Sequence, residues 1–302
     1  MPGSVFCWIP WDVFFIAGHY HDLSAKSAGS ATDDHARAYA SLCRGVHLDY
    51  TGQWDQALEQ YTNAAALFEN IGHIKKWGST ISLMAFIHHY RGEFEKSLDY
   101  ARKLKEIGVE SGDRQLKGWG LGVSGFLKIR MGKPEQALHD LEQSKILFES
   151  IPDYYALVLT HVDLMFCHLS MGDFNKADAA VKTAGTLVAD KHIKGFVLSL
   201  YYNARCELYL TAFEMSIPLA ETITLKKIKK IAARAMHCGR RFTCGLPKAC
   251  LLNGRFYAIK GNLEKANDFW HQGTQTARSL GARFEEGLIF LRWAAVLMIL
   301  TS

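Results

Sequence analysis

The chain has 302 residues, of which 49% are apolar and 22% charged, and its formal net charge is +5. These proportions are typical of a folded protein and argue against intrinsic disorder. The positive charge is too small to indicate a nucleic-acid-binding protein, and the scarcity of proline, with 6 residues, suits long helices.

The first segment, residues 1–30, fits no repeat and has no assigned structure. Its apolar stretch from Val5 to Gly18 is too short to cross a bilayer and is interrupted by Pro10 and Asp12. The segment also lacks the basic start and the clear small-residue cleavage site of a signal peptide. We therefore expect an unassigned segment at 1–30, followed by a helical repeat domain at 31–302 that has no transmembrane segment.

A heptapeptide that begins with glycine recurs at a fixed interval of 40 residues through the next part of the chain. Its copies begin at Gly52, Gly92, Gly132 and Gly172, a further copy begins at Gly261, and a degenerate copy falls in register at 212–217. Each of the five glycine copies has a small residue five positions after the glycine: Ala57, Ser97, Ala137, Ala177 and Ala266. A fixed interval of this length is the signature of a stacked repeat architecture.

The heptapeptide matches the turn between two helices. Glycine adopts the left-handed conformation that ends a helix at no steric cost, and the small residue lets the two helices approach closely. Apolar residues then recur at helical spacing. A second set of helix breakers follows twenty residues after the heptapeptides, at Gly72, Gly112, Pro152, His192 and Gly281. Each unit is therefore predicted to be a helix, a tight turn, a second helix and a loop.

These positions resemble those of the tetratricopeptide repeat, although the period is 40 rather than 34 residues. HEAT repeats share the longer period, but the glycine-to-alanine motif favours the tetratricopeptide interpretation. We predict an all-α solenoid of six tetratricopeptide-like hairpins and an apolar terminal helix at 283–300. The predicted hairpins cover residues 36–70, 76–108, 115–149, 154–189, 194–236 and 246–280.

Catalytic and metal-binding motifs are missing from the sequence. There is no phosphate-binding loop, no HExxH and no Gly-x-Ser-x-Gly. Cys238, Cys244 and Cys250 lie six residues apart, whereas zinc sites favour closer pairs. The cysteine count is odd, at seven, which suits reduced thiols in a cytosolic or nuclear protein. The sequence therefore predicts a cytoplasmic chain that is not an enzyme and holds no cofactor or metal.

One candidate binding surface is the concave side of the solenoid. In tetratricopeptide stacks the first helix of each hairpin lines that side, and here it carries aromatic rather than basic residues. Such a groove suits an amphipathic helix or a peptide. Alternatively, tight packing of the superhelix buries these rings as core. The predicted groove comprises Tyr39, Val46, Ser82, Phe86, His89, Trp119, Phe126, Phe166, Tyr202 and Tyr209.

A second candidate surface is a run of basic residues in the fifth hairpin. It includes an apolar stripe of Ile228, Ile231, Ala232 and Ala235 at helical spacing. Such a run can attract an acidic partner, calmodulin or a membrane surface, and it is more often the solvated face of a helix. The predicted basic patch comprises Lys226, Lys227, Lys229, Lys230, Arg234, Arg240 and Arg241.

Residues 240–267 and 277–287 resemble the C-terminal repeat region of soluble adenylate cyclase and of related cyclase–ATPase proteins. The resemblance could extend over residues 31–300. In that family, N-terminal catalytic domains make cyclic AMP with a divalent metal, and neither these domains nor the ATPase-like segment are in this sequence. The resemblance implies a non-catalytic regulatory or scaffold region that contacts a catalytic part of the same protein or separate protein partners. The alternative is a free-standing adaptor that binds peptides or helices in its aromatic groove.

Overall fold

The computed structural model describes residues 33–301, with side chains up to residue 295. This part of the chain is all helical, without a strand, which confirms the predicted fold class. The unassigned segment 1–30 lies outside the described residues. The helices are α2 (Asp34–Thr51), α3 (Trp54–Asn70), α4 (Ile74–Tyr90), α5 (Phe94–Glu110), α6 (Arg114–Arg130), α7 (Pro134–Glu149), α8 (Tyr154–Ser170), α9 (Phe174–Asp190), α10 (Val197–Glu214), α11 (Leu225–Gly239), η1 (Thr243–Gly245), α12 (Leu246–Ile259), α13 (Leu263–Leu280) and α14 (Arg283–Thr301).

Left-handed residues separate most of the helices, as the repeat predicts. The five heptapeptide glycines all have φ between 71° and 85°, a range in which a Cβ atom would be strained. Between hairpins, Gly72, Gly112 and Gly281 have the same conformation, and His192 reaches φ 50° without being glycine. Backbone geometry at these turns, together with the spacing of the glycines, sets the 40-residue period.

The fifth hairpin departs from the predicted register. Its turn was expected at Ala212, but α10 continues to Glu214, and the left-handed residue is Ser216, with φ 55°. Ala212 is fully buried inside α10, and no glycine is present there to end the helix. The second helix of this hairpin, α11, begins only at Leu225, so an irregular loop replaces the tight turn found in the other hairpins.

Close contacts inside each hairpin explain the small residues of the repeat. A Cβ atom on Gly45 of α2 would lie 2.5 Å from the ring of Tyr61 on α3. In the same way, a Cβ atom on Gly254 of α12 would lie 2.1 Å from Nε1 of Trp270 on α13. Tyr61 and Trp270 are both fully buried. Each glycine therefore admits an aromatic ring that fills the space between the two helices.

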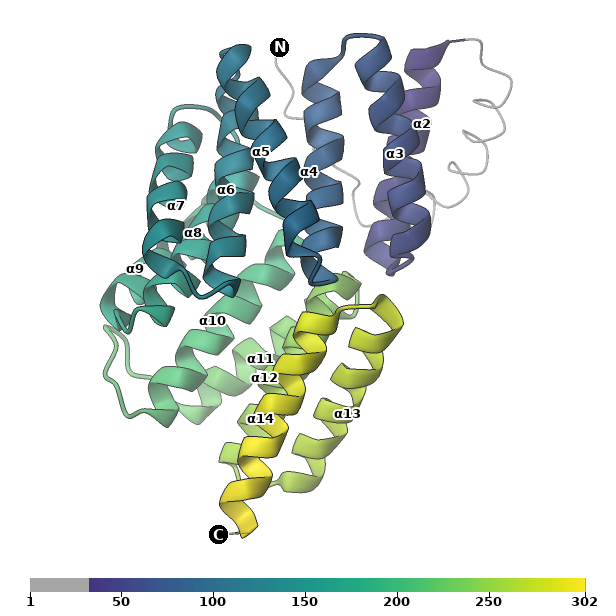
Figure 1. Ribbon diagram of the computed structural model, residues 1–302. Helices are drawn as coiled ribbons and strands as arrows, with labels where there is room; N and C mark the ends of the chain where they lie inside the picture. The colour runs from purple at the N-terminus through teal and green to yellow at the C-terminus, as the bar shows by residue number, and fades with distance from the viewer. Residues whose placement is uncertain (1–32, 302) are drawn as a thin grey trace.

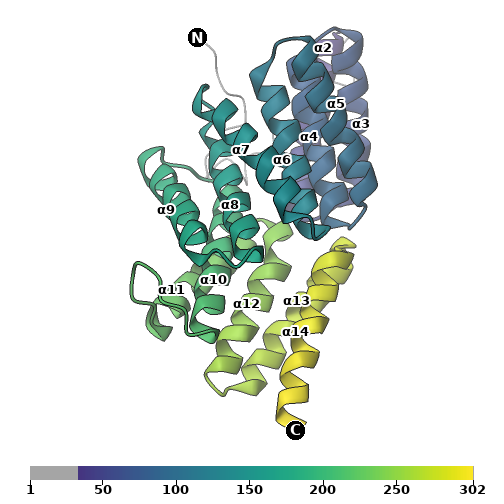
Figure 2. The same ribbon diagram turned by 60° about the vertical axis from the view of Figure 1, so that its left-hand side comes forward.

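The hairpins stack so that one set of helices lies inside the superhelix and the other outside. From α4 onward, each even-numbered helix contacts the next even-numbered helix, whereas the odd-numbered helices pack mainly on their own hairpins and their neighbours in sequence. Figures 1 and 2 show the stack turning back on itself, with the α13–α14 hairpin below α4 and α5. Two large apolar clusters, one centred on α2–α4 and one on α8–α10, hold the layers together.

Contacts between distant hairpins close the superhelix. Thr243 of η1 donates a hydrogen bond of 3.1 Å to the carbonyl oxygen of Tyr50 at the end of α2. The ring of Tyr50 also meets that of Phe242 edge-to-face, with 5.3 Å between the ring centroids. At the other contact, α14 reaches α4 and the turn that follows it, where the backbone of Phe284 approaches Gly92. None of the described helices is long and apolar enough to cross a membrane.

Candidate functional site

The inner helices enclose a cavity of about 370 Å³ in the middle of the superhelix. Its wall is built by α4, α6, α8, α10, α12 and α14, with η1 contributing Cys244 and Gly245. A smaller cavity of about 50 Å³ shares Phe86, Phe126 and Asp163 with it. The repeat itself creates this space, because it directs the same face of every first helix toward the superhelix axis.

Three phenylalanines at equivalent repeat positions form the aromatic wall of the cavity. Phe86, Phe126 and Phe166 lie six residues before the turn glycines of successive hairpins, and all three line the main cavity. Trp119 and Ser82 line the smaller cavity beside them. An apolar cavity with a few polar groups in its wall is the usual form of a ligand-binding site in a protein.

Arg130 and Glu285 close one side of the cavity by joining α6 to α14. Their ion pair measures 2.6 Å from Nη2 to Oε1, and both side chains are buried, with 14% and 3% of their surface exposed. The Arg130 guanidinium also lies over the rings of Phe284, at 4.2 Å, and Phe126, at 5.0 Å. The first residues of α14 are therefore bound to the wall of the third hairpin.

A second ionic cluster joins α10 to α12. Glu207 contacts Lys248 and Arg255, each at 2.7 Å, and Arg255 also pairs with Glu214 at 2.6 Å. Burial alone would raise the pKa of Glu207, but the positive charges of Lys248 and Arg255 lower it to about 2. This carboxylate is therefore ionised at neutral pH, and its charge is balanced from within the protein.

Asp163 of α8 differs from the other acids of the wall. Among the described residues it has no hydrogen bond or ion pair, although it lines both cavities. Burial raises the pKa of this carboxyl group well above its usual range, and the positive charge of Arg130 only partly opposes the shift. The cavity wall thus carries one carboxyl group that pairs with no base among the described residues.

The predicted groove residues separate into two groups in the structure. Ser82, Phe86, Trp119, Phe126 and Phe166 line the cavities. The remaining ones line neither cavity. Tyr39 and Val46 pack on the core of the first hairpins, Tyr209 is fully buried in the core around α10, and Tyr202 faces α11. His89 lies buried against Phe126, with 4.2 Å between their ring centroids. The alternative interpretation, burial as core, therefore applies to this second group.

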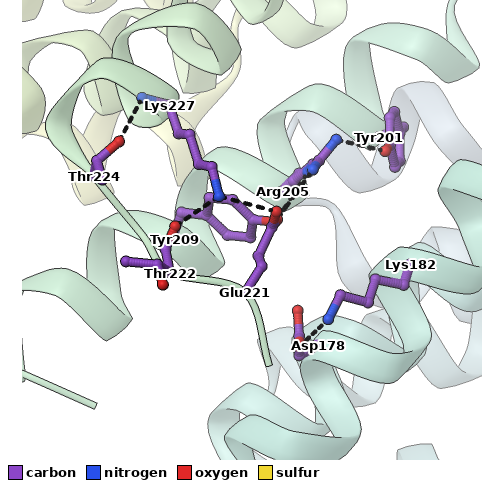
Figure 3. Close-up of polar contacts among 9 residues, drawn as sticks. All are labelled: Asp178, Lys182, Tyr201, Arg205, Tyr209, Glu221, Thr222, Thr224 and Lys227. Carbon is purple, nitrogen blue, oxygen red and sulfur yellow. Dashed lines mark hydrogen bonds and ion pairs between the residues drawn. The ribbon is translucent and has the colours of Figure 1, made fainter. Parts of the chain in front are cut away.

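All seven residues of the predicted basic patch are exposed, while Ile228, Ile231, Ala232 and Ala235 on the opposite side of α11 are buried. Figure 3 shows Lys227 reaching Glu221, which also binds Arg205 of α10 at 3.2 Å. Arg234 donates a hydrogen bond of 3.2 Å to the hydroxyl of Tyr202. Two of the seven residues therefore hold α11 and the irregular loop before it against α10.

Sequence reasoning missed the charged residues of the cavity and one amide: Arg130, Asp163, Asn203, Glu207, Lys248, Glu285 and Arg292. A signal for two of them was present. Asp163 and Asn203 occupy the repeat position at which Leu83 and Val123 are apolar and buried. The ion pair of Arg130 with Glu285 had no such signal, because its partners lie 155 residues apart.

No group of His, Cys, Asp and Glu side chains within residues 33–295 has the arrangement of a metal site. None of the cysteines in this range forms a disulfide. Cys244 lines the cavity, where burial raises the pKa of its thiol to about 12, so the thiol is protonated and a poor nucleophile at neutral pH.

Two solved structures are similar to this chain over most of its length. A Rap protein complexed with Competence and Sporulation Factor superimposes with a TM-score of 0.61 at 14% identity, covering 93% of this chain and 80% of the Rap chain. The apo form of RapI gives a TM-score of 0.64 at 13% identity, covering 88% of this chain and 92% of that one.

At these identities the likeness establishes a shared fold. No family model matches the chain, and no curated protein gives a significant match. Neither structural neighbour is a cyclase, so the resemblance to soluble adenylate cyclase receives no support from the comparisons.

Proposed function

We propose that this chain is a non-catalytic binding module that holds a short peptide segment of a partner protein in the cavity of its superhelix. The observation that carries the proposal is the column of Phe86, Phe126 and Phe166 along a cavity of about 370 Å³. Three rings at intervals of one repeat present a series of apolar contacts to an extended or helical segment. The same rings would be an unfavourable surface to leave in water.

The structural neighbours support a function in binding. One of them, which has the same helical-repeat fold, was solved as a complex with Competence and Sporulation Factor. A shared fold does not establish a shared ligand. It does favour the alternative hypothesis from the sequence, a free-standing adaptor, over the main one. Within this proposal the chain performs no chemistry and needs no cofactor, and an adenylate cyclase assay with ATP and manganese should show no turnover.

The test begins with peptides selected against the full chain from a displayed random library. The selected peptides should bind the wild type and the variant Val109→Ala, which alters a side chain on α5 that is 59% exposed and outside the cavity. Phe126→Ala and Phe166→Ala should weaken binding at least 10-fold, a loss of about 1.4 kcal/mol. Equal binding by all four folded proteins would remove the cavity as the binding site.

A photoreactive benzoylphenylalanine in place of Phe126 provides an independent test of location. It should cross-link the bound peptide, whereas the same group in place of Val109 should not. Cross-linking only at position 109 would place the peptide on the outer surface and contradict the proposal.

The narrower hypothesis, a regulatory region of a soluble adenylate cyclase-like protein, rests only on the resemblance of residues 240–267 and 277–287. Mixing the chain with purified cyclase catalytic domains and measuring cyclic AMP tests it, since a regulatory region should change the rate. A cytoplasmic location is likewise proposed, on the grounds that the described cysteines form no disulfide.

A further inference from the structure

Among residues 33–295, Asp163 forms no hydrogen bond or ion pair, whereas the other acids in the cavity wall pair with bases. Glu285 pairs with Arg130, and Glu207 pairs with Lys248 and Arg255. Arg130 is held by its ion pair and by two phenylalanine rings, so it makes no ion pair with Asp163. Arg292, the remaining base of the wall, is exposed and lies close enough to lower the pKa of Glu207.

Asn203, one repeat further along the inner face, supplies a buried acceptor without a partner. Its side chain is 3% exposed and lines the same cavity. The amide nitrogen donates a hydrogen bond of 2.9 Å to the carbonyl oxygen of Gly245, which fixes the orientation of the amide. The oxygen Oδ1 then remains without a hydrogen-bond partner among the described residues. A buried acceptor without a partner costs about 1–3 kcal/mol.

The fold does not require polar residues at these two positions. Leu83 and Val123 occupy the equivalent positions of the preceding hairpins, where they are 8% and 7% exposed. An apolar residue there would pack without any cost for desolvation. Asp163 and Asn203 therefore reduce the stability of the empty protein, and a ligand that donates hydrogen bonds to both would recover that loss.

The surrounding groups define the ligand further. Oδ1 of Asn203 is an acceptor, Asp163 supplies a carboxyl group without an ion pair among the described residues, and the rings of Phe126 and Phe166 line the same cavity. Aromatic faces attract cations, and a cation with several N–H groups can satisfy a carboxylate and an amide oxygen together. An anion or a neutral apolar group would leave Oδ1 of Asn203 unsatisfied and would give Asp163 no positive partner.

We propose that the cavity recognises a basic side chain, an arginine or a lysine of the bound peptide, whose N–H groups are accepted by Asp163 and by Oδ1 of Asn203 between the rings of Phe126 and Phe166. This proposal rests on the proposed peptide-binding function and specifies the residue that anchors the peptide. A basic side chain would supply the ion pair that Asp163 lacks among the described residues, and its positive charge would favour the ionised carboxylate.

The experiment uses pools of N-acetylated, C-amidated hexapeptides in which one position is fixed as arginine, lysine, citrulline or glutamate. Citrulline has the shape of arginine without its charge, and the blocked termini remove other charges. Binding of each pool is measured on the full chain, on Asp163→Asn and on Asp190→Asn. The last variant is a control for the loss of one negative charge, because Asp190 is exposed at the end of α9.

For the wild type and for Asp190→Asn, the arginine and lysine pools should bind at least 10-fold more tightly than the citrulline and glutamate pools. In Asp163→Asn this preference should disappear while the variant stays folded, with a melting temperature at or above that of the wild type. Binding without a charge preference, or a preference retained by Asp163→Asn, would overturn the assignment of the basic anchor and leave peptide binding intact.

Two further outcomes separate this inference from the function on which it depends. If no pool binds the wild type at millimolar concentration, the peptide-binding function fails and the anchor fails with it. Spermidine is added alone as a free amine probe. Binding of spermidine that needs Asp163, with no peptide binding, would confirm the cation site and overturn the peptide as its source.

Discussion

Arg130 of α6 and Glu285 of α14 form a buried ion pair of 2.6 Å between residues 155 positions apart in the sequence. The pair connects the third hairpin to the last helix across the cavity. Loss of one partner would leave the other charge buried and uncompensated, which typically costs 3–5 kcal/mol. Because this contact holds the start of α14 in place, its loss should act first on that helix.

We therefore predict that Glu285→Gln speeds amide hydrogen exchange in α14 far more than in α8 or α9. The free energy of unfolding should fall by about 3 kcal/mol. If detaching α14 alone costs less than this, the fall is limited to that smaller free energy. Asp99→Asn is the matched control, because the Asp99–Arg102 pair is more than half exposed on α5 and should contribute less than about 1 kcal/mol. Equal exchange rates in Glu285→Gln and the wild type would show that α14 is held by other contacts.

A pair of glycine substitutions tests the close approach of helices within a hairpin. Gly254→Ala places a methyl group 2.1 Å from Nε1 of the fully buried Trp270, so it should destabilise the protein by about 2–3 kcal/mol. Gly287→Ala on α14 meets no atom within 4 Å and should stabilise that helix by up to about 1 kcal/mol. Urea unfolding of both variants measures the change in unfolding free energy, which should be a decrease for Gly254→Ala and an increase for Gly287→Ala. No change in Gly254→Ala would contradict the tight packing.

Asp49 gives a pH dependence with a defined direction. Burial raises the pKa of this carboxyl group from 3.8 to about 7, with the hydrogen bond from Tyr61 opposing the shift. As the pH rises above 4, the unfolded chain loses this proton while the folded protein keeps it until about pH 7. Asp49 should therefore lower the free energy of unfolding by roughly 4 kcal/mol between pH 4 and pH 8.

The measurement compares the wild type with Asp49→Asn, which keeps an oxygen acceptor for Tyr61. The difference in unfolding free energy between the two should grow across this range, with the variant the more stable at pH 8. A difference that stays constant with pH would show that Asp49 titrates normally in the folded protein.

The thiols should differ in reactivity according to their burial. Cys43 is exposed, whereas Cys167 and Cys250 are buried and their thiol pKa values are raised to about 11 and about 12. Thiolates are the reactive form, so iodoacetamide at pH 8 should modify Cys43 first and should reach the other two only on unfolding. Peptide mapping by mass spectrometry measures the order, and early modification of Cys250 would contradict its burial in the α11–α12 layer.

The helices could be predicted closely because the repeat marks its own boundaries. A glycine can end a helix in the left-handed conformation wherever it stands, so Gly52, Gly92, Gly132 and Gly172 located the turns without any knowledge of tertiary contacts. At Ala212 only the 40-residue spacing predicted a turn, without a glycine. That prediction was wrong, because nothing stops a helix at a buried alanine.

The site could be predicted only in part, for a related reason. Phe86, Phe126 and Phe166 share one repeat position, and that position faces the axis of the superhelix. Tyr209 also lies on the first helix of its hairpin, but its side chain faces the core. A shift of one or two residues along a helix is enough to turn a side chain away from the superhelix axis. The contact of α14 with α6 depends on the rotation accumulated between successive hairpins of the superhelix. The sequence of a single repeat does not determine that rotation.

This closure changes how the repeats depend on one another. In an open array of repeats, a terminal repeat contacts only one neighbour and is the first to unfold. Here Thr243 donates a hydrogen bond to the end of α2, and Glu285 pairs with Arg130 of α6. Both ends of the described stack, α2 and α14, therefore contact a distant hairpin. A change at α14 can therefore reach the third hairpin directly through Glu285, and a change at η1 can reach the first hairpin through Thr243, without passing through the hairpins between.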